Sequence, residues 1–195
     1  MRPVWWLIAG VGLAGIAAGA AGIGYVRVTG LDSRAQPGQV ESLVARLARG
    51  LAVPPEVASA PNPVPLTPDV LAEGMAHFAD HCASCHADDG SGSTELGRGL
   101  YPKAPDMRSS ATQRLTDGEL FHVIEHGIRF TGMPGWSTGT KAGEESTWHL
   151  VHFIRHLPAL TAAELDRMKT LTPRSPEEVR QEIEEERFLN GEGTP

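Results

Sequence analysis

Two cysteines and the histidine that follows them are the residues of this 195-residue chain best suited to do chemistry. Cys82 and Cys85 are its only cysteines, and His86 completes the run His-Cys-Ala-Ser-Cys-His. A Cys-x-x-Cys-His run is the attachment pattern of a c-type haem. Each thiol can form a thioether with one haem vinyl group, and the imidazole can bind one face of the iron. The pattern therefore predicts one covalent haem c, held by Cys82, Cys85 and His86.

Other uses of a cysteine pair fit this chain less well. A thioredoxin-like redox pair belongs in a βαβ context, whereas the segment before Cys82 has helical periodicity and no strand-like run surrounds it. A structural zinc site needs a second pair of ligands, and the chain has no second cysteine pair. Two cysteines are also too few for a disulfide-stapled secreted scaffold.

The elements that must position this motif are predicted to be helices. Thr67-Pro68-Asp69 has the residues of a helix start, and apolar residues then recur at helical spacing as far as the motif. A capping box from Thr116 to Glu119 opens a second helix. A third, aromatic helix covers 144–157 and is stopped by Pro158. We therefore expect an all-α protein.

This order of parts resembles the mono-haem class I cytochromes c over residues 67–158. The resemblance rests on Gly74 and Phe78 in the first helix, the Cys-Ala-Ser-Cys-His motif, a Gly-Met-Pro loop and the aromatic last helix. It implies a helical domain folded around one haem. It also implies that the first and last helices cross at Gly74, against either Trp148 or Phe153.

The second axial ligand of the iron is predicted to be Met133. A thioether is a soft donor that raises the haem potential, whereas a second histidine lowers it. Met133 lies in a Gly-Met-Pro-Gly-Trp turn that resembles the distal-ligand loop of the family. His122 or His126, or the absence of any sixth protein ligand, remain alternatives. Met107 is interpreted as loop packing.

Further candidates concern the haem propionates and the proximal side. Arginine suits carboxylates because it donates charge-assisted hydrogen bonds, so Arg108 is a propionate candidate, together with the indole of Trp136. By resemblance, a backbone carbonyl near Tyr101-Pro102 would orient His86. The other histidines are interpreted as surface or hydrogen-bonded residues rather than as a second metal site.

The N-terminal residues 1–30 are predicted to anchor the chain in a membrane. The run from Val4 to Val26 carries no charge and, at about 1.5 Å per residue, is long enough to cross roughly 30 Å of hydrocarbon. Aromatic residues lie near both ends of the run, where they favour the membrane interface. A cleaved signal peptide is the alternative, because Ala18-Gly19-Ala20 resembles a cleavage site.

Residues 31–66 are predicted to form a Pro-rich linker with one short amphipathic helix. Apolar residues from Val40 to Leu51 follow helical spacing. This helix could lie on the membrane surface, with Arg46 and Arg49 near the headgroups, or pack on the next domain. Five prolines then favour an extended spacer that lets the domain at 67–160 reorient.

Residues 161–195 form an acidic extension beyond the family pattern. Two capping boxes predict helices near 162–170 and 176–189. Such a charged helix is usually only a solvated face. The other hypothesis is that the extension docks a partner subunit.

The overall charge excludes one class of function. The chain carries a formal net charge of −7, so a general nucleic-acid binder, which needs a basic face, is not expected. An acidic domain instead suits a basic docking face on a partner protein.

These observations predict a membrane-tethered, mono-haem cytochrome c of the periplasmic or other extracytoplasmic side. It would pass single electrons between respiratory or dehydrogenase components, as an electron carrier or as a subunit of an oxidoreductase complex. A peroxidase-like haem enzyme or a haem-based sensor with an open sixth position is the alternative.

Overall fold

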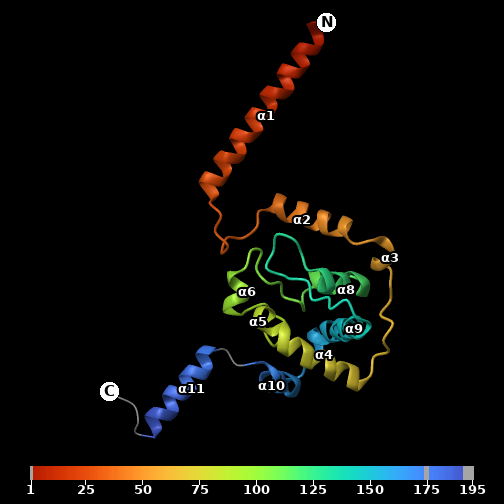
Figure 1. Ribbon diagram of the computed structural model, residues 1–195, viewed down its shortest axis with the longest axis vertical. Coiled ribbons are helices and arrows are strands. Elements are labelled where there is room, and N and C mark those ends of the chain that lie inside the picture. The colour runs from red at the N-terminus through yellow and green to blue at the C-terminus, as the bar shows by residue number, and fades with distance from the viewer. Residues whose placement is uncertain (1, 174–175, 191–195) are drawn as a thin grey trace. The chain divides into compact units, whose positions relative to one another are not determined.

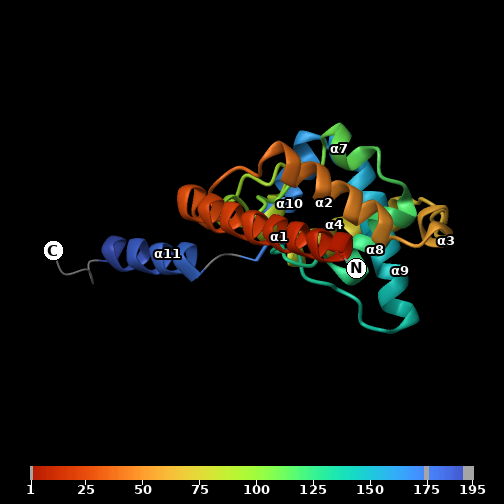
Figure 2. The ribbon, with the colours of Figure 1, turned by 90° about the horizontal axis from the view of Figure 1, so that it is seen from above.

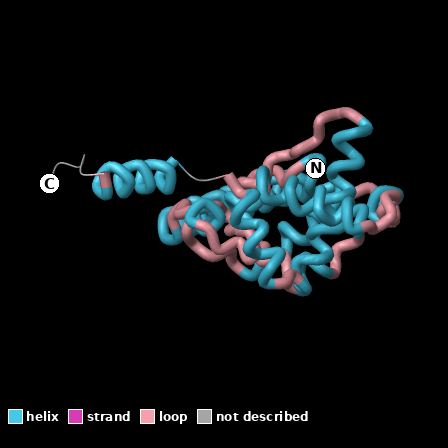
Figure 3. The backbone as a smooth tube through the Cα atoms, turned by 90° about the horizontal axis from the view of Figure 1, so that it is seen from below, coloured by secondary structure: helices cyan, strands magenta, loops and turns pink. Residues whose placement is uncertain are grey.

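The computed structural model describes residues 2–173 and 176–190, and every regular element in these ranges is a helix (Figures 1 and 3). The all-α prediction is confirmed. The chain divides into two compact units, Met1–Gln36 and Pro37–Pro195.

The first unit consists mainly of α1 (Arg2–Thr29). Its stretch Val4–Thr29 has a mean hydropathy of 1.9 and buries none of its most apolar window. A helix of this length and composition fits a single-pass membrane anchor.

The core of the second unit is the crossing of α4 (Pro68–His81) and α9 (Lys141–His156), with α8 (Asp117–His126) packed on α9. The side chains of Phe78 and Phe153 are fully buried at this crossing, with ring centroids 5.2 Å apart. Burying each such ring contributes about 1.5–3 kcal/mol. This crossing holds the last turn of α4, and thus the cysteine motif, in place.

The aromatic partner of Gly74 at the crossing is Phe153 rather than Trp148. A Cβ atom added to Gly74 would lie 3.1 Å from the Cβ of Phe153. Trp148 lies on another face of α9, where it stacks on Phe121 of α8 at a centroid distance of 4.2 Å. Trp148 and Phe153 are five residues apart, so their side chains are rotated by about 140° relative to each other and face different partners.

Short helices surround the motif: α5 (Ala83–His86), α6 (Glu95–Gly99) and α7 (Ser110–Gln113). Gly97 in α6 packs directly under the motif, since a Cβ there would come within 2.1 Å of the Cys85 carbonyl oxygen. The α9 helix begins at Lys141, before the predicted start, because Thr140 caps it by accepting a hydrogen bond from Gly143 N.

The Pro-rich segment contains α2 (Gln39–Ala52) and α3 (Pro55–Ala58). The expectation of a free, extended spacer from residue 54 to 65 is wrong. Asn62 donates a hydrogen bond to the Trp148 carbonyl at 3.0 Å, and His152 contacts the Val64 carbonyl at 2.7 Å. Proline at the first helical position needs no N–H partner, so Pro55 starts α3 rather than preventing it.

The α2 helix lies along the outside of the domain with an unusual orientation (Figures 1 and 2). Ser42 and Arg49, two turns apart, are half-buried on its inner side. The apolar residues lie on the opposite side: Leu47 is 59% exposed and Leu51 is 87% exposed. Its polar side therefore faces the domain, and its apolar stripe faces outward.

The C-terminal helices agree with the sequence prediction. After a 3-10 turn, η1 (Leu157–Ala159), comes α10 (Ala162–Leu171), which packs on α4 and fully buries Met168. The Thr172 hydroxyl then donates a hydrogen bond to Asp88 at 2.6 Å. The last helix, α11, covers Pro176–Leu189.

Candidate functional site

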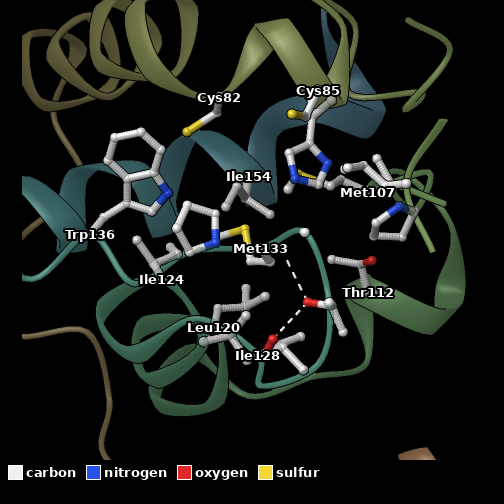
Figure 4. Close-up of a pocket in the computed structure, with 18 of the residues that line it drawn as sticks. Cys82, Cys85, Met107, Thr112, Leu120, Ile124, Ile128, Met133, Trp136 and Ile154 are labelled. Carbon is white, nitrogen blue, oxygen red and sulfur yellow. Dashed lines mark hydrogen bonds between the residues drawn. The ribbon is translucent and has the colours of Figure 1, made fainter. Parts of the chain in front are cut away.

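A largely apolar cavity lies between α4, α8, α9 and the loops around residues 100–107 and 128–136 (Figure 4). It contains about 1250 Å³ of space, part of it open to solvent. Cys82, Cys85, His86 and Met133 all line this cavity.

The two cysteines lie at the same end of this cavity, where Figure 4 shows both sulfur atoms. Cys82 ends α4, and a turn in which His86 N donates to the Cys82 carbonyl at 2.9 Å brings Cys85 round to the cavity. Both thiols are free. Burial, and then the neighbouring Cys85, raises the pKa of Cys82 to about 12. A reactive redox pair needs a lowered thiol pKa, so this environment argues against thioredoxin-like chemistry.

His86 lines the cavity as a buried imidazole. Only 7% of the residue is exposed, and burial lowers its pKa, which favours the neutral form, while the backbone of Pro105 acts in the opposite direction. Its Nδ1 atom is buried without a hydrogen-bond partner. Neutral imidazole is the form that binds metals. The backbone group beside the ring belongs to Pro105, rather than to the Tyr101-Pro102 stretch that the resemblance implied.

The loop that carries Met133 is fixed by its own hydrogen bonds. The Met133 amide donates to the Thr131 hydroxyl oxygen at 3.1 Å, and that hydroxyl donates to the Ile128 carbonyl at 2.7 Å. Ile128 N in turn donates to the Met133 carbonyl at 3.1 Å. Figure 4 shows the Met133 side chain pointing into the cavity. A thioether is thus presented from irregular backbone to the centre of the site.

Glycine is required where this loop leaves α8. Gly127 has a φ of +66°, and a Cβ atom there would lie 2.6 Å from the Met133 carbonyl oxygen. Only glycine combines this backbone conformation with such a close approach at little cost. The helix end at Gly127 therefore sets the path of the Met133 loop.

The alternative ligands lie differently. His122 and His126 do not line the cavity, and their rings stack on each other with centroids 4.3 Å apart. Met107 does line it, alongside Met133. Most other histidines bind neighbours: His77 contacts Ser146, and His149 pairs with Glu73. Within residues 2–173 and 176–190, no group of three or more His, Cys, Asp or Glu residues could hold a separate metal ion.

The two propionate candidates are separated by the structure. Trp136 lines the cavity, but it lies beside Cys82 and packs edge-on against His81 at 5.2 Å. Arg108 does not line the cavity. Its guanidinium pairs with Asp89 at 2.8 Å and with Asp106 at 2.9 Å, and its hydrogen bond is the main cause of the lowered pKa of Asp106.

Two other cations do line the cavity, Lys103 and Arg49 of α2. Arg49 was not identified from the sequence as a candidate for the haem site. Arg49 precedes the motif by several helices, so its sequence position gave no indication of proximity. The available signal was its place on the polar side of an amphipathic helix, opposite the apolar stripe.

A comparison with known families identifies the part of the chain that builds this cavity. The model of the family described as "Cytochrome C oxidase, cbb3-type, subunit III" matches residues 69–154. That range includes the cysteine motif, α8 and the Met133 loop. Residues 69–154 form a class I-like c-type cytochrome domain. A cytochrome c domain binds haem c covalently, and the chain is therefore a haem protein of electron transport.

The residues of this cytochrome c domain fit the cofactor. Two free thiols share one wall, an imidazole has a buried and unpaired Nδ1, and a thioether points into an apolar space. Soft sulfur and neutral imidazole are the donors that haem iron takes in cytochromes. The donor set thus agrees with the family match.

Proposed function

We propose that this chain is a membrane-tethered, mono-haem cytochrome c that carries single electrons between components of a respiratory chain or a dehydrogenase complex. The observation that carries the proposal is the convergence of Cys82, Cys85, His86 and Met133 on one apolar cavity. The haem supplies an iron that cycles between Fe(III) and Fe(II). The protein attaches the haem, positions the ligands of its iron and provides its apolar surroundings.

In this proposal Cys82 and Cys85 would attach the cofactor, and His86 and Met133 would be the protein ligands of its iron. The short hydrogen-bonded turn between Cys82 and His86 makes the three attachment groups one rigid unit. The bonds between Thr131, Ile128 and Met133 hold the thioether in the same way. A site that is preorganised before it changes charge needs little rearrangement during electron transfer.

The apolar lining tunes the site toward electron transfer. Among the described residues, no carboxylate lines the cavity, and much of its lining is aliphatic, as at Leu120, Ile124 and Ile154. A methionine ligand raises the haem potential, and burial of the site acts on the potential as well. An iron with two protein ligands in such an apolar site would favour a carrier over a peroxidase or a gas sensor.

We place the domain on the extracytoplasmic side, with α1 as an uncleaved anchor. Two features support the membrane assignment: the apolar composition of α1 and the exposed apolar stripe of α2. Haem c is attached outside the cytoplasmic membrane, which supports the extracytoplasmic location of the domain. The α2 stripe would lie on the lipid surface, because a loop of nine residues from Gly30 to Gly38 joins it to α1 and spans at most about 30 Å.

The partners in this proposal are redox proteins of a respiratory complex. The family match supports a place beside an oxidase. The acidic composition of the chain suits a basic docking face on the partner. Such an association should weaken as salt is added.

An absorption spectrum of the haem-loaded chain, oxidised and reduced, tests the proposal. A closed His–Met iron gives a far-red sulfur-to-iron charge-transfer band when oxidised, and no shift with carbon monoxide when reduced. A ready carbon monoxide shift would instead indicate an open site. Peroxide turnover or gas sensing would then replace electron transfer as the better hypothesis.

A further inference from the structure

Arg49 contributes a charged side chain to the lining of a largely apolar cavity. It is half-buried and lines the cavity from α2. Among the residues whose side chains the structure describes, no carboxylate forms an ion pair with Arg49 or with Lys103. Burying part of a guanidinium without a counter-charge is costly. The site is therefore complementary to an anion.

The chemistry of haem indicates which anion this is. Haem carries its two vinyl groups on adjacent pyrroles and its two propionates on the other two. Once the vinyl groups are fixed at the cysteines, the propionates must project toward the other end of the cavity. The cysteines lie at the α4–α5 end, and α2 lies across the domain from α4 in Figure 1. The cations that line the cavity, Arg49 and Lys103, are thus the candidates for that end.

A hydrogen bond holds α2 over this edge. The Tyr101 hydroxyl donates to Glu41 Oε1 at 2.6 Å, and Tyr101 belongs to the loop that also supplies Lys103 to the lining. The bond fixes the first turn of α2, while Arg49 lies two turns later on the same side. The polar side of α2 therefore faces inward because it carries both Glu41, which binds Tyr101, and Arg49, which lines the cavity.

We propose that Arg49 binds a haem propionate, and that α2 thereby closes the propionate edge of the haem. Arg49 lies outside the segment 69–154 that matches the cytochrome family, so this contact is an addition made by the N-terminal part of this chain. Lys103 provides a second, weaker cation for the same edge. The inference rests on the covalent haem alone and holds whichever protein donates or accepts the electron.

Arg49→Gln in the full-length, haem-loaded chain tests this assignment, with Arg46→Gln as the matched control. Arg46 lies on the same helix but is exposed and is not among the residues that line the cavity. Loss of a cation beside a propionate leaves its negative charge uncompensated, which favours Fe(III). We expect a lower midpoint potential for Arg49→Gln at low salt and a shifted propionate bending band in the resonance Raman spectrum. Arg46→Gln should change neither.

A second variant and a contradicting outcome complete the test of the contact between Arg49 and a propionate. Arg49→Lys should keep most of the potential but still shift the Raman band, since an ammonium cannot donate as a planar fork. If the Arg49→Gln protein does not take up haem, the proposal is tested by comparing the Arg49→Lys protein with the Arg46→Gln protein. Equal potentials and an unchanged propionate band in the Arg49 variants would overturn the proposal. These readouts do not involve a redox partner, so they can succeed even if the proposed function fails.

Discussion

Gly74 of α4 lies directly against the backbone of His149 in α9: a Cβ atom at position 74 would come within 2.3 Å of the His149 carbonyl oxygen. This contact sets the distance between the two helices whose crossing supports the haem motif. The carbonyl is part of a helix and cannot turn away. A side chain at position 74 must therefore push the helices apart.

Gly74→Ala is expected to lower the free energy of unfolding by about 1–3 kcal/mol, the usual cost of overpacking a tight core. Gly50→Ala in α2 is the control, because a Cβ there meets nothing within 4 Å. Denaturant unfolding of the haem-loaded proteins measures both. A Gly74→Ala protein as stable as the Gly50→Ala protein would mean that the helices separate without cost.

Replacing Met133 should open the iron. Met133→Ala is expected to lose the far-red sulfur band and to bind carbon monoxide when reduced, while Met133→His should lower the midpoint potential. Met107→Leu is the control, since Met107 lines the same cavity. If Met107→Leu loses the sulfur band and Met133→Ala keeps it, Met107 rather than Met133 is the iron ligand.

The outer stripe of α2 should contact lipid. Cysteine at position 47 would be the only free thiol once Cys82 and Cys85 are bound to haem, so a spin label can be attached to it alone. In nanodiscs, a label in Leu47→Cys should meet oxygen readily and be shielded from a water-soluble nickel complex. A label in Ser42→Cys, on the inner side, should be shielded from both. Free access of the nickel complex to position 47 would refute lipid contact.

Glu164 should make stability depend on pH. The Thr161 backbone N–H, at 2.8 Å, is the main cause of its lowered pKa, followed by the Thr161 hydroxyl and His156. A carboxyl group with a lowered folded-state pKa stabilises the fold above its ordinary value of 4.5, and this contribution is lost as the pH falls through the lowered pKa.

Glu164→Gln should therefore lower the free energy of unfolding at pH 7 by roughly 0.5–1 kcal/mol, as the loss of a helix cap does. The difference from wild type should shrink below about pH 4.5. Exposed Glu145 provides the control variant, Glu145→Gln. Denaturant unfolding at several pH values measures the difference, and a constant difference would exclude the carboxylate as its source.

The last helix of the C-terminal extension, α11, is the part whose removal tests the docking hypothesis. A chain that ends at Pro173 keeps α10 and the bond from Thr172 to Asp88. If the extension docks a partner subunit, this truncation should slow haem reduction in reconstituted membranes and leave the haem spectrum intact. Unchanged transfer kinetics would leave α11 as a solvated helix.

Local patterns made much of this protein predictable. Capping boxes at Thr116 and Thr161 placed two helix starts, because a cap depends only on residues within one turn. The Cys-x-x-Cys-His run likewise indicated its cofactor, because covalent attachment needs only a few adjacent residues. The prediction that Pro54–Pro65 is a free spacer was wrong, because the bonds from Asn62 and to Val64 are long-range.

The sequence by itself determined the helices, the apolar anchor segment and the haem chemistry, since each is written in residue types at short spacing. Only the tertiary structure decided that Phe153 rather than Trp148 packs at Gly74, that Arg108 pairs with Asp89, and that Arg49 lines the cavity. These are choices among several chemically suitable side chains. Which one reaches the site depends on the rotation of each helix and the path of each loop, and distant contacts set both.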